Sequence, residues 1–160
     1  MNPIHKEYFI EKDRLPVTVA LADGEPVDGL LFVQPGWRKP SVELDAPSIL
    51  RLADPFFPLQ LGDGSTRLVA KAQVVVLRGA PADDGVVPDG SGDVCPVQVW
   101  CRNGHVVRGR LIITRFGPNT RVLDFLNHDN DEFLIVHEDG ATALVNRRHI
   151  TMVRDDSDGA

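Results

Sequence analysis

The sequence PVTVALADGEPVDGLLFV, residues 16–33, returns in altered form 80 positions later as PVQVWCRNGHVVRGRLII, residues 96–113. Seven of the 18 aligned positions are identical, with no gap. Both segments open with apolar residues at every second position, followed by Asp-Gly or Asn-Gly. The alternation predicts a half-buried strand, and the dipeptide predicts a tight hairpin turn. Each segment is therefore expected to form a strand, a turn and a second strand.

The similarity continues toward the C-terminus at an offset of 76 residues, which brings Asp63-Gly64 onto Asp139-Gly140. We interpret the chain as an internal duplication. The segment between the copies is rich in Gly, Pro and Asp, which predicts a flexible linker. The predicted parts are an N-terminal extension (1–14), a first copy (15–78), the linker (79–94), a second copy (95–154) and an acidic tail (155–160).

Each copy is predicted to contain five short antiparallel strands, with a short helical turn between the second and third, over 47–54 and 120–127. Gly29 and Gly109 fall inside the second strands, where a glycine indicates a bend or bulge. Closure into a small barrel removes unpaired edges, so we expect two tandem five-stranded barrels in a mainly β protein. Because about 60 residues make a marginal core, the two copies are expected to pack on each other.

This arrangement resembles the Sm-like (SH3-like) small β-barrel, including that of bacterial Sm-like proteins. The resemblance is carried by VQVWCRNGHVVRGRLI (97–112) and by ALVNRRHITMV (143–153), in which a basic corner precedes the last strand. It implies an RNA or nucleotide site, to which only four residues correspond: Asn146, Arg147, Arg148 and His149. The segment 115–133 departs from the family, because it is longer than the loop that helps to form the RNA pocket there.

The charge distribution is uneven. The whole chain carries a net charge of −6, which argues against a surface that binds nucleic acid throughout. The second copy, in contrast, holds eight arginines and six acidic residues. Arginine binds phosphate and carboxylate groups through two hydrogen bonds, so Arg108 and Arg110 join the corner residues as an anion-binding candidate. A solvated exterior is the alternative.

Two tryptophans are candidates for an interface. Trp100 lies on the polar face of its predicted strand, together with Arg102, and an aromatic side chain in such a place is typical of a contact surface. Trp37 lies in the additional residues of the first copy. Packing within the chain is the alternative for both.

The sequence holds no recognisable catalytic or metal-binding pattern. No nucleophile motif, phosphate-binding glycine loop or closely spaced histidine pair is present, so we expect neither an enzyme nor a bound metal or cofactor. Cys95 and Cys101 lie about 20 Å apart along one strand and are expected to be core residues. No apolar run reaches membrane-spanning length, and two cysteines form no disulfide framework, so a cytoplasmic protein is expected.

We therefore expect a non-enzymatic binding or scaffolding protein. It would engage a protein partner, or another copy of itself, through a strand edge or the face that carries Trp100. The alternative is an Sm-like RNA or nucleotide binder that uses the arginines of the second copy.

Overall fold

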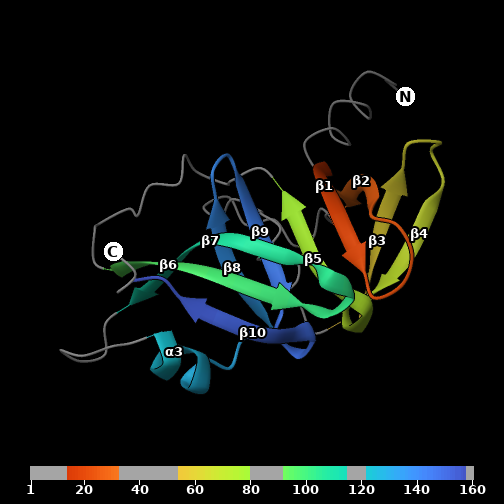
Figure 1. Ribbon diagram of the computed structural model, residues 1–160. Coiled ribbons are helices and arrows are strands. Elements are labelled where there is room, and N and C mark those ends of the chain that lie inside the picture. The colour runs from red at the N-terminus through yellow and green to blue at the C-terminus, as the bar shows by residue number, and fades with distance from the viewer. Residues whose placement is uncertain (1–13, 33–53, 80–91, 115–121, 158–160) are drawn as a thin grey trace.

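The computed structural model describes residues 14–32, 54–79, 92–114 and 122–157. Ten antiparallel strands form one continuous sheet, in the order β10-β6-β7-β8-β9-β5-β1-β2-β3-β4 (Figure 1). Helical elements lie between several strands. The strands are β1 (Arg14–Leu21), β2 (Val27–Phe32), β3 (Phe56–Leu61), β4 (Thr66–Ala70), β5 (Val74–Gly79), β6 (Gly92–Cys101), β7 (Val106–Thr114), β8 (Phe133–Glu138), β9 (Ala141–Asn146) and β10 (Ile150–Asp155), and the helical elements are η2 (Lys71–Gln73), η3 (Arg102–Gly104), α3 (Val122–His128) and η4 (Arg147–His149).

The sheet has two halves with the same order of strand pairing. In the first half (14–79) the order is β5-β1-β2-β3-β4, and in the second half (92–157) it is β10-β6-β7-β8-β9. Each half also skips one residue where its last strand pairs with its first. Val75 is skipped between β5 and β1, and Thr151 between β10 and β6. The two skipped residues stand one position after the start of their strands.

The expectation that each half closes into its own barrel is wrong for the described residues. In a closed barrel the fourth strand would lie beside the fifth strand of the same half. Instead, β9 pairs with β5 of the other half, and β4 and β10 are the two outer strands of the sheet. An edge strand is satisfied as well by a partner from a neighbouring unit as by its own. The two halves therefore share one open sheet.

The predicted turns occupy the expected places. Gly24, Gly64, Gly104 and Gly140 all have positive φ, as does Asn103 at 62°. Gly109 has a different role, because a Cβ atom there would lie 2.5 Å from the carbonyl oxygen of His137. The glycine lets β8 approach β7 closely, which is the physical reason for a glycine inside this strand.

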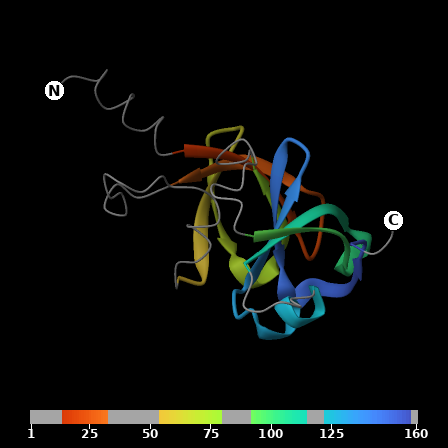
Figure 2. The same cartoon turned by 90° about the vertical axis from the view of Figure 1, so that its left-hand side faces the viewer.

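Helix α3 lies between β7 and β8, where the sequence predicts a helical turn. Figures 1 and 2 show it at the same end of the second half as β10. Except for Asp54, the corresponding prediction for 47–54 lies outside the described residues, as do most of the N-terminal extension and of the linker. Strand β6 begins at Gly92, three residues before the predicted start of the second copy.

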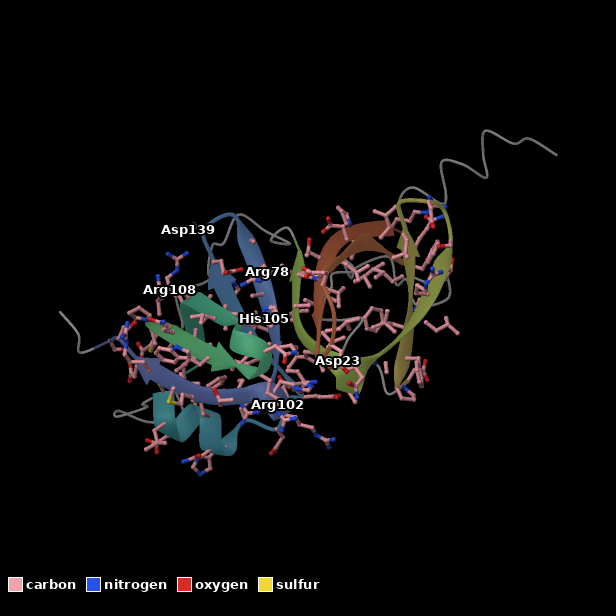
Figure 3. All side chains as sticks on the ribbon, turned by 45° about the vertical axis from the view of Figure 1, so that its right-hand side comes forward. Asp23, Arg78, Arg102, His105, Arg108 and Asp139 are labelled. Atoms are coloured by element: carbon pink, nitrogen blue, oxygen red, sulfur yellow. The ribbon has the colours of Figure 1, made fainter. Side chains whose placement is uncertain are left out.

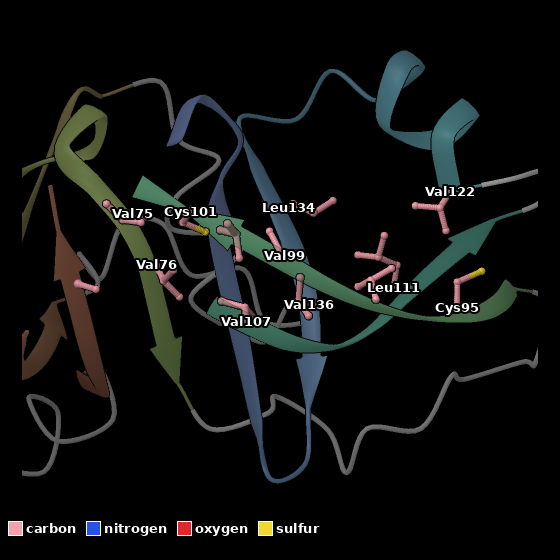
Figure 4. Close-up of a cluster of buried hydrophobic side chains, with 14 of the residues drawn as sticks. Val75, Val76, Cys95, Val99, Cys101, Val107, Leu111, Val122, Leu134 and Val136 are labelled. Carbon is pink, nitrogen blue, oxygen red and sulfur yellow. The ribbon is translucent and has the colours of Figure 1, made fainter. Parts of the chain in front are cut away.

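Two clusters of buried apolar side chains form the interior. The first core lies in the first half and contains Val17, Val19, Leu31, Phe57, Leu59, Val69, Val74 and Leu77, with Phe133 and Leu144 from the second half. The second core lies in the second half and contains Cys95, Val97, Val99, Cys101, Val107, Leu111, Ile113, Val122, Leu134, Val136, Ala143 and Val145, with Ala20, Val75 and Val76 from the first half (Figure 4).

Candidate functional site

The junction between β5 and β9 joins the two halves through main-chain pairing. Four residue pairs face each other across it, from Val76 opposite Val145 to Gly79 opposite Thr142. A fifth strand of one half is thereby paired with a fourth strand of the other. The pairing of β5 with β9 therefore shows how the fifth strand of one half binds the fourth strand of the other.

Side chains cross this junction in both directions. Val76 of β5 is 1% exposed and belongs to the second core, whereas Leu144 of β9 is 1% exposed and belongs to the first. Figure 4 shows Val75 and Val76 on β5 beside the other labelled side chains of the second core. Each half therefore completes the core of the other, which stabilises the junction by burying apolar surface.

Polar side chains from the corner of the second half bind the corner of the first. The buried Asn146 side chain donates through Nδ2 to the carbonyl oxygen of Lys71, at 3.3 Å, and accepts through Oδ1 from the amide of Arg148, at 3.0 Å. The Nε2 atom of His149 lies 2.8 Å from the carbonyl oxygen of Ala72. Because a carbonyl oxygen only accepts, Nε2 carries the proton. Two of the four corner residues are thus bound to main-chain groups of the first half.

The two corner arginines differ in their surroundings. Arg147 is half-buried, donates to the carbonyl oxygen of Leu126, and lies 3.5 Å from a carboxylate oxygen of Asp129. Arg148 is exposed. The corner therefore presents one exposed guanidinium group rather than the four-residue site that the sequence suggests.

Further contacts join the halves outside the strand ladder. Arg78 donates through Nε to Glu138, at 2.8 Å, and through Nη2 to the second carboxylate oxygen, at 3.4 Å. Asn103 donates through its side-chain amide to the carbonyl oxygen of Ala22. Figure 3 labels Asp23, Arg102 and His105 in this region, where the two turns meet between the halves.

The outer edges carry the counterparts of the junction residues. Leu68 of β4 occupies the position of Leu144 in the strand pairing, and Met152 of β10 occupies the position of Val76. Leu68 is 72% exposed and Met152 is 59% exposed. In each strand the neighbouring side chain that faces inward, Val69 or Val153, packs on the core of its own half. Because successive side chains of a strand point to opposite faces, Leu68 faces away from the first core.

A third pair of corresponding residues shows the same contrast between a buried side chain and an exposed one. Phe133 faces Asn146 across β8 and β9, and Phe56 faces Ala70 across β3 and β4. Phe133 is buried in the first core, whereas Phe56 is 55% exposed. The sequence alignment instead matches Phe133 with Phe57, which is one position off. Five residues separate the paired Gln60 and Thr66, whereas four separate the corresponding pair His137 and Thr142, and this shifts the third strands by one.

These exposed side chains lie on two surfaces. The β4 edge surface consists of strand β4, which includes Leu68, together with Phe56 of β3. The β10 edge surface consists of strand β10, which includes Met152, together with Trp100 of β6. Trp100 lies opposite Met152, and the guanidinium carbon of Arg154 lies 5.8 Å from the centre of its ring. Sequence reasoning finds Trp100 but misses the three apolar side chains. A signal exists for Met152 alone, in the difference between VVVL (74–77) and ITMV (150–153), since unbroken apolar runs are typical of strands buried on both faces.

The other predicted site residues do not gather into one site. Arg102 and Arg108 are exposed, and Arg110 is exposed with its Nη1 3.6 Å from a carboxylate oxygen of Asp139. Figure 3 shows Arg108 on the same side of the second half as Asp139. Trp37 lies outside the described residues.

Both cysteines are free and buried, as the sequence predicts. Burial raises the pKa of Cys101 to about 11. Among the described residues, no group of three or more His, Cys, Asp or Glu side chains could hold a metal ion. No helix in the described parts of the chain is long and apolar enough to cross a membrane.

The chain was compared with protein families, curated proteins and solved structures. No protein-family profile, curated protein or solved structure matches this chain.

Proposed function

We propose that this chain is a non-enzymatic protein-binding or scaffolding module that binds a partner strand on the outer strands of its sheet, β4 and β10. The observation that carries the proposal is the contrast between the β5–β9 junction and the β4 and β10 edges. Residues that are buried in the junction have exposed apolar counterparts at both edges. An exposed strand edge with apolar side chains beside it favours the addition of a further strand.

The proposal includes an origin for the two halves. We propose that they arose by duplication of one Sm-like (SH3-like) small-barrel unit. The identical order of strand pairing and the residue skipped at the start of each fifth strand support this origin. In this interpretation each unit is completed by the strand of a neighbour rather than by its own closure.

Binding of RNA or a nucleotide is the second candidate, favoured by the exposed Arg108 and Arg148. It receives less support than protein binding, because Asn146 and His149 already bind main-chain carbonyl groups of the first half. Phosphate contacts make affinity fall steeply with salt. Single-stranded RNA titrated at two salt concentrations, with wild type and with Arg108→Ala/Arg148→Ala, tests this candidate. The absence of saturable binding at low salt contradicts it.

Photo-crosslinking tests the proposed function. A benzophenone amino acid replaces Leu68 or Met152 in cells that make the protein, with Leu123 as the control position. Leu123 is 64% exposed and lies on the helix α3 rather than on an edge strand. We expect discrete protein adducts from positions 68 and 152 and none from 123. Equal adducts from all three positions, or none from either edge, contradict the proposal, and adducts sensitive to ribonuclease favour RNA binding instead.

A further inference from the structure

We infer that the outward face of β7 is a docking surface for an extended acidic peptide of a partner protein. Alternate residues of this strand, Val107, Leu111 and Ile113, are buried in the second core. The residues between them face outward, because successive side chains of a strand point to opposite faces. This surface lies on a face of the sheet rather than on its outer strands, β4 and β10, so the inference does not rest on the proposed function.

The outward side chains of β7 form an ordered pattern. Val106, Arg108, Arg110 and Ile112 follow each other at every second position, which places two arginines between two apolar residues. Val106 is 38% exposed, both arginines are exposed, and Ile112 is half-buried. The pattern is therefore open to solvent, most of all at its two basic positions.

Strand β6 widens both apolar ends of this pattern. Trp100 lies opposite Val106, and Val94 lies opposite Ile112. Val94 is 51% exposed, and Trp100 is half-buried. The four outward residues of β7, together with Trp100 and Val94, are called the β7 docking surface. This surface consists of two apolar rows with two arginines between them.

Both arginines are available to an incoming group. No hydrogen bond or ion pair joins the side chain of Arg108 to another of the residues that the structure describes. Arg110 lies 3.6 Å from Asp139, whose side chain is 99% exposed, and Figure 3 labels Asp139 on the same side as Arg108. Because a pair so open to water contributes little, another carboxylate can replace Asp139. Each guanidinium group can bind a carboxylate through two hydrogen bonds.

The spacing of the arginines selects the conformation of the partner. Two residues of a strand span about 6.8 Å between Cα atoms, and an extended peptide has the same repeat. Acidic side chains at every second position of such a peptide point to one face and would meet Arg108 and Arg110 in turn. An apolar residue at either end would contact the two apolar rows. The complementary sequence is therefore apolar-x-acidic-x-acidic-x-apolar.

The fold does not itself require this pattern. In the first half, Asp28 and Leu30 occupy the places of Arg108 and Arg110 in the strand pairing. Asp28 accepts a hydrogen bond from Thr18 at 2.6 Å. The equivalent strand thus forms with one acidic and one apolar residue at these positions. The two arginines of β7 therefore serve a role other than folding, which supports a binding surface.

Trp100 favours a peptide over a nucleic acid at this surface. A base would stack on an open face of the aromatic ring. The guanidinium carbon of Arg154 lies 5.8 Å from the centre of that ring, and Arg154 is held by hydrogen bonds to Gln98, at 2.9 Å, and to Asp156, at 2.6 Å. One face of the ring is therefore already occupied. An apolar side chain needs no open ring face, so a peptide can still contact the row that Trp100 forms with Val106.

Fluorescence anisotropy of a labelled synthetic peptide, FTETETL, tests the inference on the full chain. We expect saturable binding that weakens as the salt concentration rises, because exposed charges are screened. Arg108→Glu/Arg110→Glu is expected to raise the dissociation constant by about a hundredfold or more, since two charge-assisted contacts are replaced by repulsion. The matched control is Arg67→Glu/Arg148→Glu, which makes the same change of charge at two exposed arginines of other elements. This control should bind as the wild type does.

An exchange of charges separates lost binding from lost folding. The peptide FTKTKTL is expected to bind Arg108→Glu/Arg110→Glu and not the wild type. Leu68→Lys, which changes the β4 edge surface, should bind FTETETL as tightly as the wild type does. Circular dichroism compares the fold of all these proteins.

Four results would overturn the inference. They are no saturable binding of FTETETL to the wild type up to about 1 mM, equal weakening in the matched control, no binding of FTKTKTL to the charge-reversed variant, and displacement of FTETETL by single-stranded RNA, which assigns the surface to RNA instead. If FTETETL does not bind while the edge positions give discrete protein crosslinks, this inference fails and the proposed function stands.

Discussion

Leu144 of β9 lies directly opposite Leu77 of β5, and both side chains are buried in the first core. One comes from each half of the chain, so the first core is incomplete without a strand from the second half. The same relationship holds in reverse for Val76, which belongs to the second core. Each core therefore contains side chains from both halves.

Leu144 and its counterpart Leu68 form a matched pair of substitutions. Leu144→Ala is expected to lower the free energy of unfolding by about 2–5 kcal/mol, because it leaves a cavity between the halves. Leu68→Ala is expected to change it by less than about 0.5 kcal/mol in the single chain, because the side chain is 72% exposed. Urea unfolding of the dilute protein measures both. Equal effects would contradict the assignment of Leu144 to a shared core.

Asn146 provides a second test of the junction. Asn146→Ala removes the donor to the carbonyl oxygen of Lys71 and the acceptor for the amide of Arg148. Loss of partners for buried main-chain groups is expected to lower the free energy of unfolding by about 1–3 kcal/mol. The exposed Arg148 side chain is the neighbouring control, and Arg148→Ala should be nearly neutral. If Asn146→Ala binds RNA less tightly and is as stable as the wild type, Asn146 serves a ligand site instead.

Alanine substitutions at Gly109 and Gly62 test whether β7 and β8 approach each other closely at Gly109. A Cβ atom at Gly109 would lie 2.5 Å from the carbonyl oxygen of His137, whereas nothing lies within 4 Å of one at Gly62. Gly109→Ala is expected to cost about 3 kcal/mol or more or to prevent folding, since main chain must move. Gly62→Ala is expected to be tolerated. Thermal unfolding of both variants compares them, and a stable Gly109→Ala protein would contradict the close approach of β7 and β8.

His137 makes stability depend on pH. Burial, and then the nearby charge of Arg110, lowers the pKa of His137 below its ordinary value of 6.5. The imidazole therefore takes up a proton less readily in the folded chain than in the unfolded one. Stability is therefore expected to fall as the pH drops through about 6.5, and less so in His137→Gln. Titration by NMR checks the cause: the pKa of His137 should rise in Arg110→Gln, and a wild-type value above 6.5 would contradict it.

The strands and turns were predictable because their signals are local. Apolar alternation marks β1 and β6, and the Asp-Gly and Asn-Gly pairs give the turns at Gly24, Gly64, Gly104 and Gly140. The pairing of β5 with β9 was not predictable in this way, because it joins residues far apart in sequence. Nothing local indicates whether an edge pairs with its own half or with a neighbour.

The candidate site was predicted only in part, for a chemical reason. The side chains of Asn146 and His149 can each donate a hydrogen bond to a phosphate or to a main-chain carbonyl oxygen. The sequence does not indicate which of these two acceptors lies beside them. The structure places two carbonyl groups there. Leu68 and Met152 were missed because each stands beside a second apolar residue, Val69 or Val153, and the sequence does not indicate which of the two faces the core. The exposure of Leu68 becomes evident only when the strand order is known.

Hydrogen–deuterium exchange of the purified chain, alone and mixed with the partner that the edge crosslinks identify, tests the central claim most directly. Amides of an unpaired edge exchange readily, and pairing with a partner strand protects them. We predict that 66–70 or 150–155 exchanges more slowly in the mixture, that 74–79 and 141–146 do not change, and that Leu68→Lys/Met152→Lys abolishes the effect. Equal exchange of both β4 and β10 with and without the partner, or the same slowing in the double variant, would contradict the claim that these edges bind a partner strand.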